Sequence, residues 1–151
     1  FEQGYWLPKD ASDDSRAQWI SNSDIRDYIR AIQSRHTLLI TDACFSGGIF
    51  KTRGGLAESD KAIQELYSMP SRKAMTSGTL TEVPDHSTFL DYLTQRLQDN
   101  KQNYMSADQL FYRFREAVIN NSPNTPQYGV IHEAGDEGGE YIFIRRAAGG
   151  S

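Results

Sequence analysis

The residues most able to do chemistry surround the only cysteine of the chain, Cys44. Three consecutive apolar residues, 38–40, predict a strand buried on both faces, as in parallel sheets. Asp42 follows this strand, and the run Ser46-Gly47-Gly48 predicts a turn. Cys44 should therefore lie just past the carboxyl end of a core strand, where open α/β sheets bind their ligands.

Taken alone, a single cysteine is more often a small buried apolar residue than a nucleophile. Asp42 favours chemistry here, because an ionised carboxylate at the end of a core strand costs free energy unless it has a partner or a task. A phosphatase loop and a phosphate-binding loop are both excluded by Phe50, which stands where one needs Arg and the other Gly. A redox motif needs a second cysteine. Nucleophilic catalysis by a thiolate remains the candidate chemistry for Cys44.

The run Asp42-Ala43-Cys44-Phe45-Ser46-Gly47 resembles the D-x-C-x-S-G signature of the caspase-like cysteine peptidases, in the branch of metacaspases, paracaspases and bacterial caspase homologues. Three other stretches resemble this family in the same order along the chain. Residues 4–11 resemble the segment that follows the catalytic histidine, residues 71–78 the next core strand, and residues 138–143 the closing strand. The resemblance implies an α/β fold, a caspase-like α/β/α sandwich with a mostly parallel central sheet.

The resemblance also implies the roles of the catalytic groups. Cys44 would be the nucleophile, and its backbone N–H would be one donor to the oxyanion. The base would be a histidine in a His-Gly pair upstream of residue 4, and no such pair is present. None of the three histidines, His36, His86 and His132, stands at that place, although His86 is the least implausible substitute. We therefore expect the histidine, and the first strands of the fold, on a companion N-terminal segment or chain.

Asp42 has a second implied role, in the pocket for the P1 side chain of the substrate. In metacaspases and paracaspases the acid at this place gives a preference for Arg or Lys, and a carboxylate suits a guanidinium because the two pair bidentately. The alternative is a strand-end Asp that accepts hydrogen bonds from nearby backbone N–H groups. Glu82 and Asp85 could add acids at the rim of the pocket, or be ordinary solvated loop residues.

A metal or another cofactor is not expected. Many metacaspases bind calcium, and Asp10 and Asp24 fall near positions that carry ligands in such enzymes. Residues 49–51 (Ile-Phe-Lys), however, offer no carboxylate where a further ligand is needed.

Composition limits the remaining classes. The 151 residues are 38% hydrophobic and 24% charged, which suits one globular domain over residues 1–151. One cysteine is compatible with the reducing cytoplasm, where we expect the protein. A net charge of −4 and the lack of a long apolar run give no reason to expect nucleic acid or membrane as partner.

Hydrophobic spacing and capping residues predict an alternation of helices and strands, with parallel strands covered by helices on both faces. Helices are expected from Ser21–Asp24 to about Gln33, over residues 60–67, from Thr88 with Asp91 in a capping box, and from Ser106 with Gln109 in another. Strands are expected at residues 38–40, 72–77, 128–131 and 140–145, an extended segment at 1–10 and a flexible tail at 147–151.

Together these features predict a cysteine endopeptidase that cleaves after Arg or Lys, with a Cys-His dyad completed from outside this chain. Two alternatives remain open. One is a pseudoprotease, a caspase-like module that binds or scaffolds without catalysis. The other is one half of a processed enzyme that is inert until it is paired.

Overall fold

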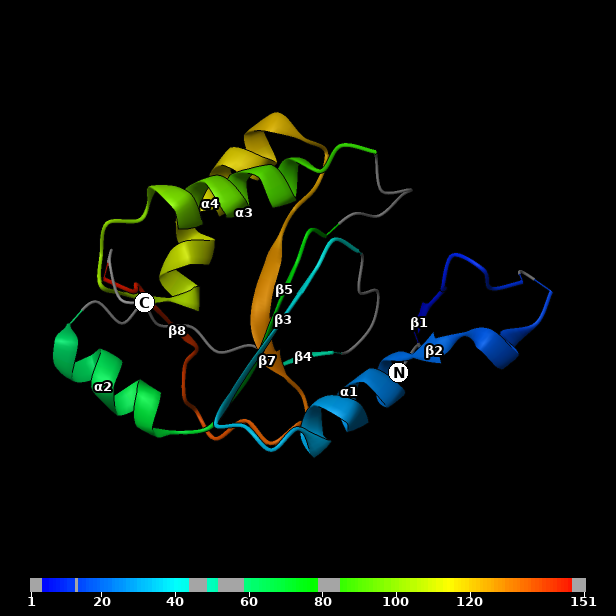
Figure 1. Cartoon of the computed structure of the whole chain (residues 1–151). Helices are drawn as coiled ribbons and strands as arrows, with labels where there is room; N and C mark the ends of the chain where they lie inside the picture. The colour runs from blue at the N-terminus through cyan, green and yellow to red at the C-terminus, as the bar shows by residue number, and fades with distance from the viewer. Residues whose placement is uncertain (1–3, 13, 44–48, 52–58, 79–84, 148–151) are drawn as a thin grey trace.

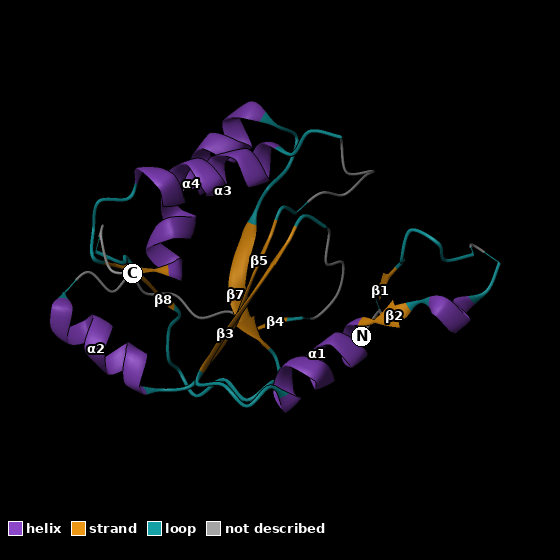
Figure 2. Cartoon of the chain, in the orientation of Figure 1, coloured by secondary structure: helices purple, strands orange, loops and turns teal. Residues whose placement is uncertain are grey.

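The computed structural model describes residues 4–12, 14–43, 49–51, 59–78 and 85–147. Its main sheet has four strands in the order β3-β5-β7-β4, shown in Figures 1 and 2. The strands span His36–Thr41 (β3), Phe50–Lys51 (β4), Ser71–Thr76 (β5) and Gln127–Ile131 (β7). The fold is therefore of the mixed α/β class.

The direction of the strands differs from our expectation. β3 and β5 are parallel, with six residue pairs from His36↔Ser71 to Thr41↔Thr76, but β7 runs antiparallel to both β5 and β4. The described sheet is thus mixed and not mostly parallel. The reason is that two helices, and not one, connect β5 to β7. The first leads the chain away from the carboxyl edge and the second leads it back there, so β7 enters the sheet at the edge where β5 ends (Figure 1).

Two smaller antiparallel sheets flank the main one. β1 (Tyr5–Trp6) pairs with β2 (Ile20–Ser21), and this hairpin lies away from the main sheet in Figure 1. β6 (Tyr104–Ser106) pairs with β8 (Ile142–Ile144). The closing strand predicted at residues 140–145 is therefore real but shorter, and it pairs outside the main sheet.

Serine caps start all four α-helices, and the predicted positions are nearly right. The helices span Asn22–Ala31 (α1), Asp60–Ser68 (α2), Thr88–Asp99 (α3) and Ala107–Asn121 (α4), with a short 3-10 helix at Arg16–Gln18. Ser21 with Asp24, and Ser106 with Gln109, form the two reciprocal capping boxes. The box predicted at Thr88 is wrong by one residue, because the hydroxyl of Ser87 accepts the first free N–H, that of Leu90, at 3.1 Å.

Helices cover both faces of the main sheet. On one face, Ile25 and Ile29 of α1 pack near Leu39 and Ala74. On the other face α3 and α4 pack against Met75, Leu38 and Ile40. The alternation of side chains along a strand explains this division, because neighbours in sequence point to opposite faces. The result is three layers, helix, sheet and helices (Figures 1 and 2).

β5 and β3 differ in burial. Every residue of β5 is buried, whereas every residue of β3 is only half-buried. The prediction that residues 38–40 are buried on both faces is therefore wrong. β3 is the outermost of the described strands on its side of the sheet, so one edge of it has no neighbouring strand there.

Arg72 fastens the amino edge of this sheet. The side chain is 7% exposed, and its guanidinium donates to the carbonyl oxygens of Ile32, Ser34, Arg35 and Ser71 at 2.7–3.3 Å. Three of these carbonyls belong to the connection between α1 and β3. Because a buried cation is costly without such acceptors, this arrangement fixes the entry of β3 beside β5.

A glycine with a left-handed backbone ends the β5 segment. Gly78 has φ +68°, and a Cβ there would lie 1.9 Å from the carbonyl oxygen of Thr125. Gly78→Ala should therefore lower the free energy of unfolding by more than the roughly 1–2 kcal/mol that a left-handed conformation costs an L-residue. Gly135→Ala is the matched control, since Gly135 has φ +94° but open space around its Cβ position. Urea unfolding of both variants tests this, and equal losses of unfolding free energy would contradict the close approach of Gly78 to the backbone of Thr125.

Candidate functional site

The candidate site lies where β3 and β5 end side by side. Thr41, the last residue of β3, pairs with Thr76, and the backbone N–H of Ser77 donates to the carbonyl oxygen of Thr41 at 3.2 Å. Ser77 is fully buried. The sheet therefore places Asp42 and Ala43 at its carboxyl edge, beside the end of β5. This is the location predicted for the catalytic segment, although Cys44, Ser46-Gly47-Gly48 and Glu82 themselves lie outside the described residues.

Asp42 is half-buried at this edge, and within the described part of the chain no hydrogen bond or ion pair engages its carboxylate. The alternative prediction was that Asp42 accepts hydrogen bonds from nearby backbone N–H groups. None of the described backbone N–H groups donates to its carboxylate. A partly desolvated carboxylate without a partner is destabilising unless a ligand pairs with it. Another polar atom at the same edge, Oγ1 of Thr76, is buried and also has no partner in the described part.

β7 closes this edge from the other side. Gln127 pairs with Thr76, and the preceding segment reaches Gly78 through the carbonyl of Thr125. The ends of β3 and β5 and the start of β7 thus meet at one edge of the sheet. Converging strand ends of this kind hold functional groups rigidly because the sheet fixes their spacing.

Asp85 and His86 precede Ser87, the cap of α3, and Figure 1 shows that α3 begins at the end of the molecule where β5 ends. Both residues are exposed. His86 Nε2 lies 2.5 Å from Asp91 Oδ2, and these side chains are 82% and 55% exposed. The capping box predicted at Thr88 gave Asp91 a different role, and its contact with His86 was not predicted. Two residues five positions apart at the start of a helix form no recognisable sequence pattern. No described contact joins Asp85 to Asp42.

His36 lies at the opposite edge, as the first residue of β3. Its Nε2 donates to the carbonyl oxygen of Tyr67 and its Nδ1 accepts from the hydroxyl of Ser71, both at 2.8 Å. Its ring also stacks on that of Tyr67, with centroids 4.9 Å apart. Partial burial, with Arg35 and Arg72 nearby, lowers the pKa of His36 below its ordinary value, although the bond to Tyr67 opposes this shift. His36 joins β3 to the end of α2 and does not face the candidate site.

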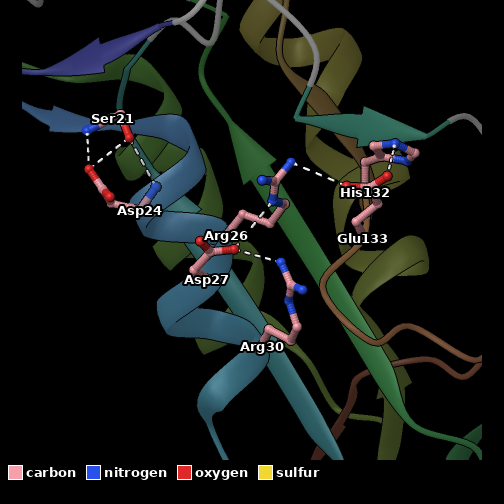
Figure 3. A network of polar contacts seen from close by, with 7 residues as sticks. All are labelled: Ser21, Asp24, Arg26, Asp27, Arg30, His132 and Glu133. Atoms are coloured by element: carbon pink, nitrogen blue, oxygen red, sulfur yellow. Dashed lines mark hydrogen bonds and ion pairs between the residues drawn. The ribbon is translucent and has the colours of Figure 1, made fainter.

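His132 is at the same remote edge, because it follows Ile131 at the far end of the antiparallel strand β7. Its Nε2 lies 3.4 Å from Glu133 Oε1, and Glu133 pairs with Arg26 of α1 at 3.5 Å (Figure 3). Figure 3 also shows Arg26 and Arg30 around Asp27, at 3.7 and 2.6 Å. These contacts tie α1 to the segment after β7. They give His132 a surface role.

Of the two residues considered as calcium ligands, Asp24 accepts hydrogen bonds at a helix cap and Asp10 is exposed. Asp24 accepts from the hydroxyl and the backbone N–H of Ser21, and these bonds lower the pKa of Asp24 (Figure 3). Asp10 is exposed in the hairpin region. Among the described residues no three His, Cys, Asp or Glu side chains are grouped to hold a metal ion.

No protein-family model, curated protein or solved structure matches this chain. None of the described helices is long and apolar enough to cross a membrane.

The contacts of His36 predict a structural role that pH can reveal. Because the folded state lowers the pKa of His36, the unfolded chain takes up a proton first as the pH falls below about 6.5. The stability that the neutral ring contributes should be lost as the pH falls through the lower folded pKa. His36→Gln should flatten this part of the stability profile. Urea unfolding between pH 7 and pH 5 measures this, and identical profiles for wild type and His36→Gln would contradict the assignment.

Proposed function

We propose that the chain is the main part of a caspase-like cysteine endopeptidase that cleaves proteins or peptides after Arg or Lys. Cys44 is the nucleophile, and the general base is a histidine from a companion N-terminal segment or chain. The observation that carries this proposal is Asp42, a half-buried carboxylate without a described partner at the carboxyl edge, two residues before the only cysteine. The caspase-like sandwich belongs to the proposal, supported by α1 on one face of the sheet and α3 with α4 on the other.

The P1 preference follows from the state of Asp42. An Arg side chain offers parallel N–H donors that match the two oxygens of a carboxylate, and Lys offers a compact charge. Pairing with the substrate would relieve the cost of a half-buried charge that has no partner among the described residues, whereas an acidic P1 side chain would add a like charge. Asp85, exposed before α3, and Glu82 are proposed as additional acids at the rim.

The chemistry needs a base close to Cys44. The thiolate attacks the scissile carbonyl, and the backbone N–H of Cys44 donates to the oxyanion that forms. The protonated histidine then gives its proton to the leaving amine, and water hydrolyses the thioester. His36 and His132 lie at the opposite edge of the sheet, and His86 contacts Asp91. These placements favour a histidine from outside the 151 residues. The segment that carries it could pair with the free long side of β3, along which no described strand lies.

The other class of function is a caspase-like pseudoprotease that binds peptides without cleaving them. The same pocket around Asp42 would then select a basic side chain, but no bond would break. Cleavage assays separate the two proposals, because binding of an Arg peptide is expected from both and turnover from only one.

Peptides with Arg or Lys at P1 should be cleaved by the chain joined to its histidine segment, and peptides with Asp at P1 should not. Asp42→Asn should lower kcat/KM for the Arg peptide by about 10²-fold or more, because the substrate loses a half-buried charged hydrogen-bonding partner. Asp99→Asn, at the end of α3, is the matched control and should retain full activity. Efficient cleavage after Asp, or an Asp42→Asn variant as active as wild type, would refute the pocket.

Residues 1–151 alone should be inactive, and adding the segment with the His-Gly pair, fused or as a separate chain, should restore activity. The reason is that a thiol with a pKa near 8.5 is only a few per cent thiolate at neutral pH, and general acid–base help is worth roughly 10²–10⁴-fold. Cys44→Ala should abolish the restored activity without unfolding the protein. Full activity of residues 1–151 without an added segment would show that the base is within the chain, and His86→Gln would then be the variant to assay first.

A further inference from the structure

The outer face of the β6–β8 sheet carries an apolar groove beside α2. Side chains alternate along these strands, so Met105 and Phe143 point to the core formed with α3 and α4. Tyr104, Ile142 and Ile144 are on the opposite face. Together with Asp60, Ile63, Gln64 and Tyr67 of α2, they line a cavity of about 260 Å³.

The residues that the structure describes fill this groove only in part. α2 has an apolar face but no buried residue. Tyr67, Tyr104 and Ile144 are 42%, 53% and 56% exposed, so three large apolar side chains face solvent around one groove. Apolar side chains gathered in this way mark an interaction surface more often than single exposed ones do.

One end of the groove is basic. An adjoining cavity of about 380 Å³ shares Tyr104 and Ile144 and is also lined by Arg145 and Arg146. Neither arginine has an ion-pair partner among the residues that the structure describes, and Arg145 is held in place by donating to the carbonyl oxygen of Lys101 at 3.2 Å. In a chain with a net charge of −4, two arginines without a described ion-pair partner beside an apolar groove favour a ligand that is apolar and acidic.

We propose that this groove binds a short peptide segment of a protein partner, with one or two large apolar side chains and Asp or Glu residues next to them. The apolar side chains occupy the groove between α2 and the β6–β8 sheet, and the carboxylates pair with Arg145 and Arg146. The 260 Å³ cavity is smaller than the ~300–1,000 Å³ typical of small-molecule pockets, which suits anchoring side chains better than a whole ligand. The groove is not part of the carboxyl edge, so this proposal does not depend on the catalytic one.

Fluorescence anisotropy with a labelled Gly-Ser-Phe-Leu-Gly-Glu-Glu-Gly peptide tests the proposal. The protein is residues 1–151 with the Cys44→Ala substitution, so that cleavage cannot interfere. We expect a dissociation constant on the order of 10–100 μM, as is usual for small interfaces. Peptides with Ser in place of Phe and Leu, or with Lys in place of both Glu residues, should bind at least about tenfold more weakly.

Matched variants locate the binding. Ile144→Asp should weaken binding about tenfold or more, while Ile119→Asp on α4 should leave it unchanged. The double variant Arg145→Glu/Arg146→Glu should reverse the preference, so that the Lys peptide binds better than the Glu peptide. Arg115→Glu is the control for charge. Circular dichroism confirms that each variant is folded. No binding of the Glu peptide below 1 mM, equal binding of the Ser peptide, or an unchanged preference in the double arginine variant would overturn the proposal.

Discussion

The parallel pairing of β3 with β5 is the constraint on which the rest of the structure depends. β3 and β5 are separated by α2 in the sequence, and six residue pairs in continuous register bring the ends of the two strands together. β5 is buried along its whole length and carries β3 on one side and β7 on the other. If β3 slipped by one residue along β5, its side chains would point to the opposite faces of the sheet. Leu39 would then turn away from Ala74 and α1, and Leu38 and Ile40 would turn away from Met75, α3 and α4. The two cores therefore fix the register, and the register fixes which residues meet at the carboxyl edge.

Both ends of this pairing are secured by polar contacts. At the amino edge, the guanidinium of Arg72 binds the carbonyls between α1 and β3, and His36 bridges Ser71 and Tyr67. At the carboxyl edge, Ser77 donates to Thr41, and Gly78 admits the backbone of Thr125. Asp42 follows directly after the last of these contacts. The position of the half-buried Asp42 is thus fixed by the contacts of β3 with β5 and not by β3 alone.

Local signals in the sequence predicted most elements. The capping boxes at Ser21 and Ser106 set the starts of α1 and α4. Apart from the cap of α3, which is Ser87 and not Thr88, the errors concern partners distant in sequence. The half-burial of β3 depends on which strands adjoin it, and the pairing of β8 with β6 depends on how α3 and α4 fold back. The short strand β4 pairs with only two residues of β7, which leaves no periodic pattern to detect.

The candidate site was predicted to a similar degree. The sequence placed Asp42 at a strand end, and the structure confirms that location and adds that the carboxylate has no described partner. Asp85 is exposed before α3, and the catalytic roles of Cys44 and Glu82 remain predictions, since both lie outside the described residues. His36 precedes the strand predicted at residues 38–40, so the sequence already placed it at the end remote from Asp42, and the structure confirms this. The sequence alone could not show that His132 shares that end. That placement depends on β7 running antiparallel, which no local pattern encodes.

Covalent labelling of Cys44 tests the central claim, a thiol nucleophile beside a pocket for basic side chains, most directly. Two peptidyl acyloxymethyl ketones, identical except for Arg or Asp at P1, are incubated with the chain joined to its histidine segment. The rate of modification at Cys44 is followed by mass spectrometry of the digested protein. The account predicts that the Arg reagent modifies Cys44 at least about tenfold faster than the Asp reagent, and that Asp42→Asn removes this difference, because pairing with a half-buried carboxylate is worth more than about 1.4 kcal/mol. Equal rates for the two reagents in the wild-type protein, or modification of residues other than Cys44, would contradict it.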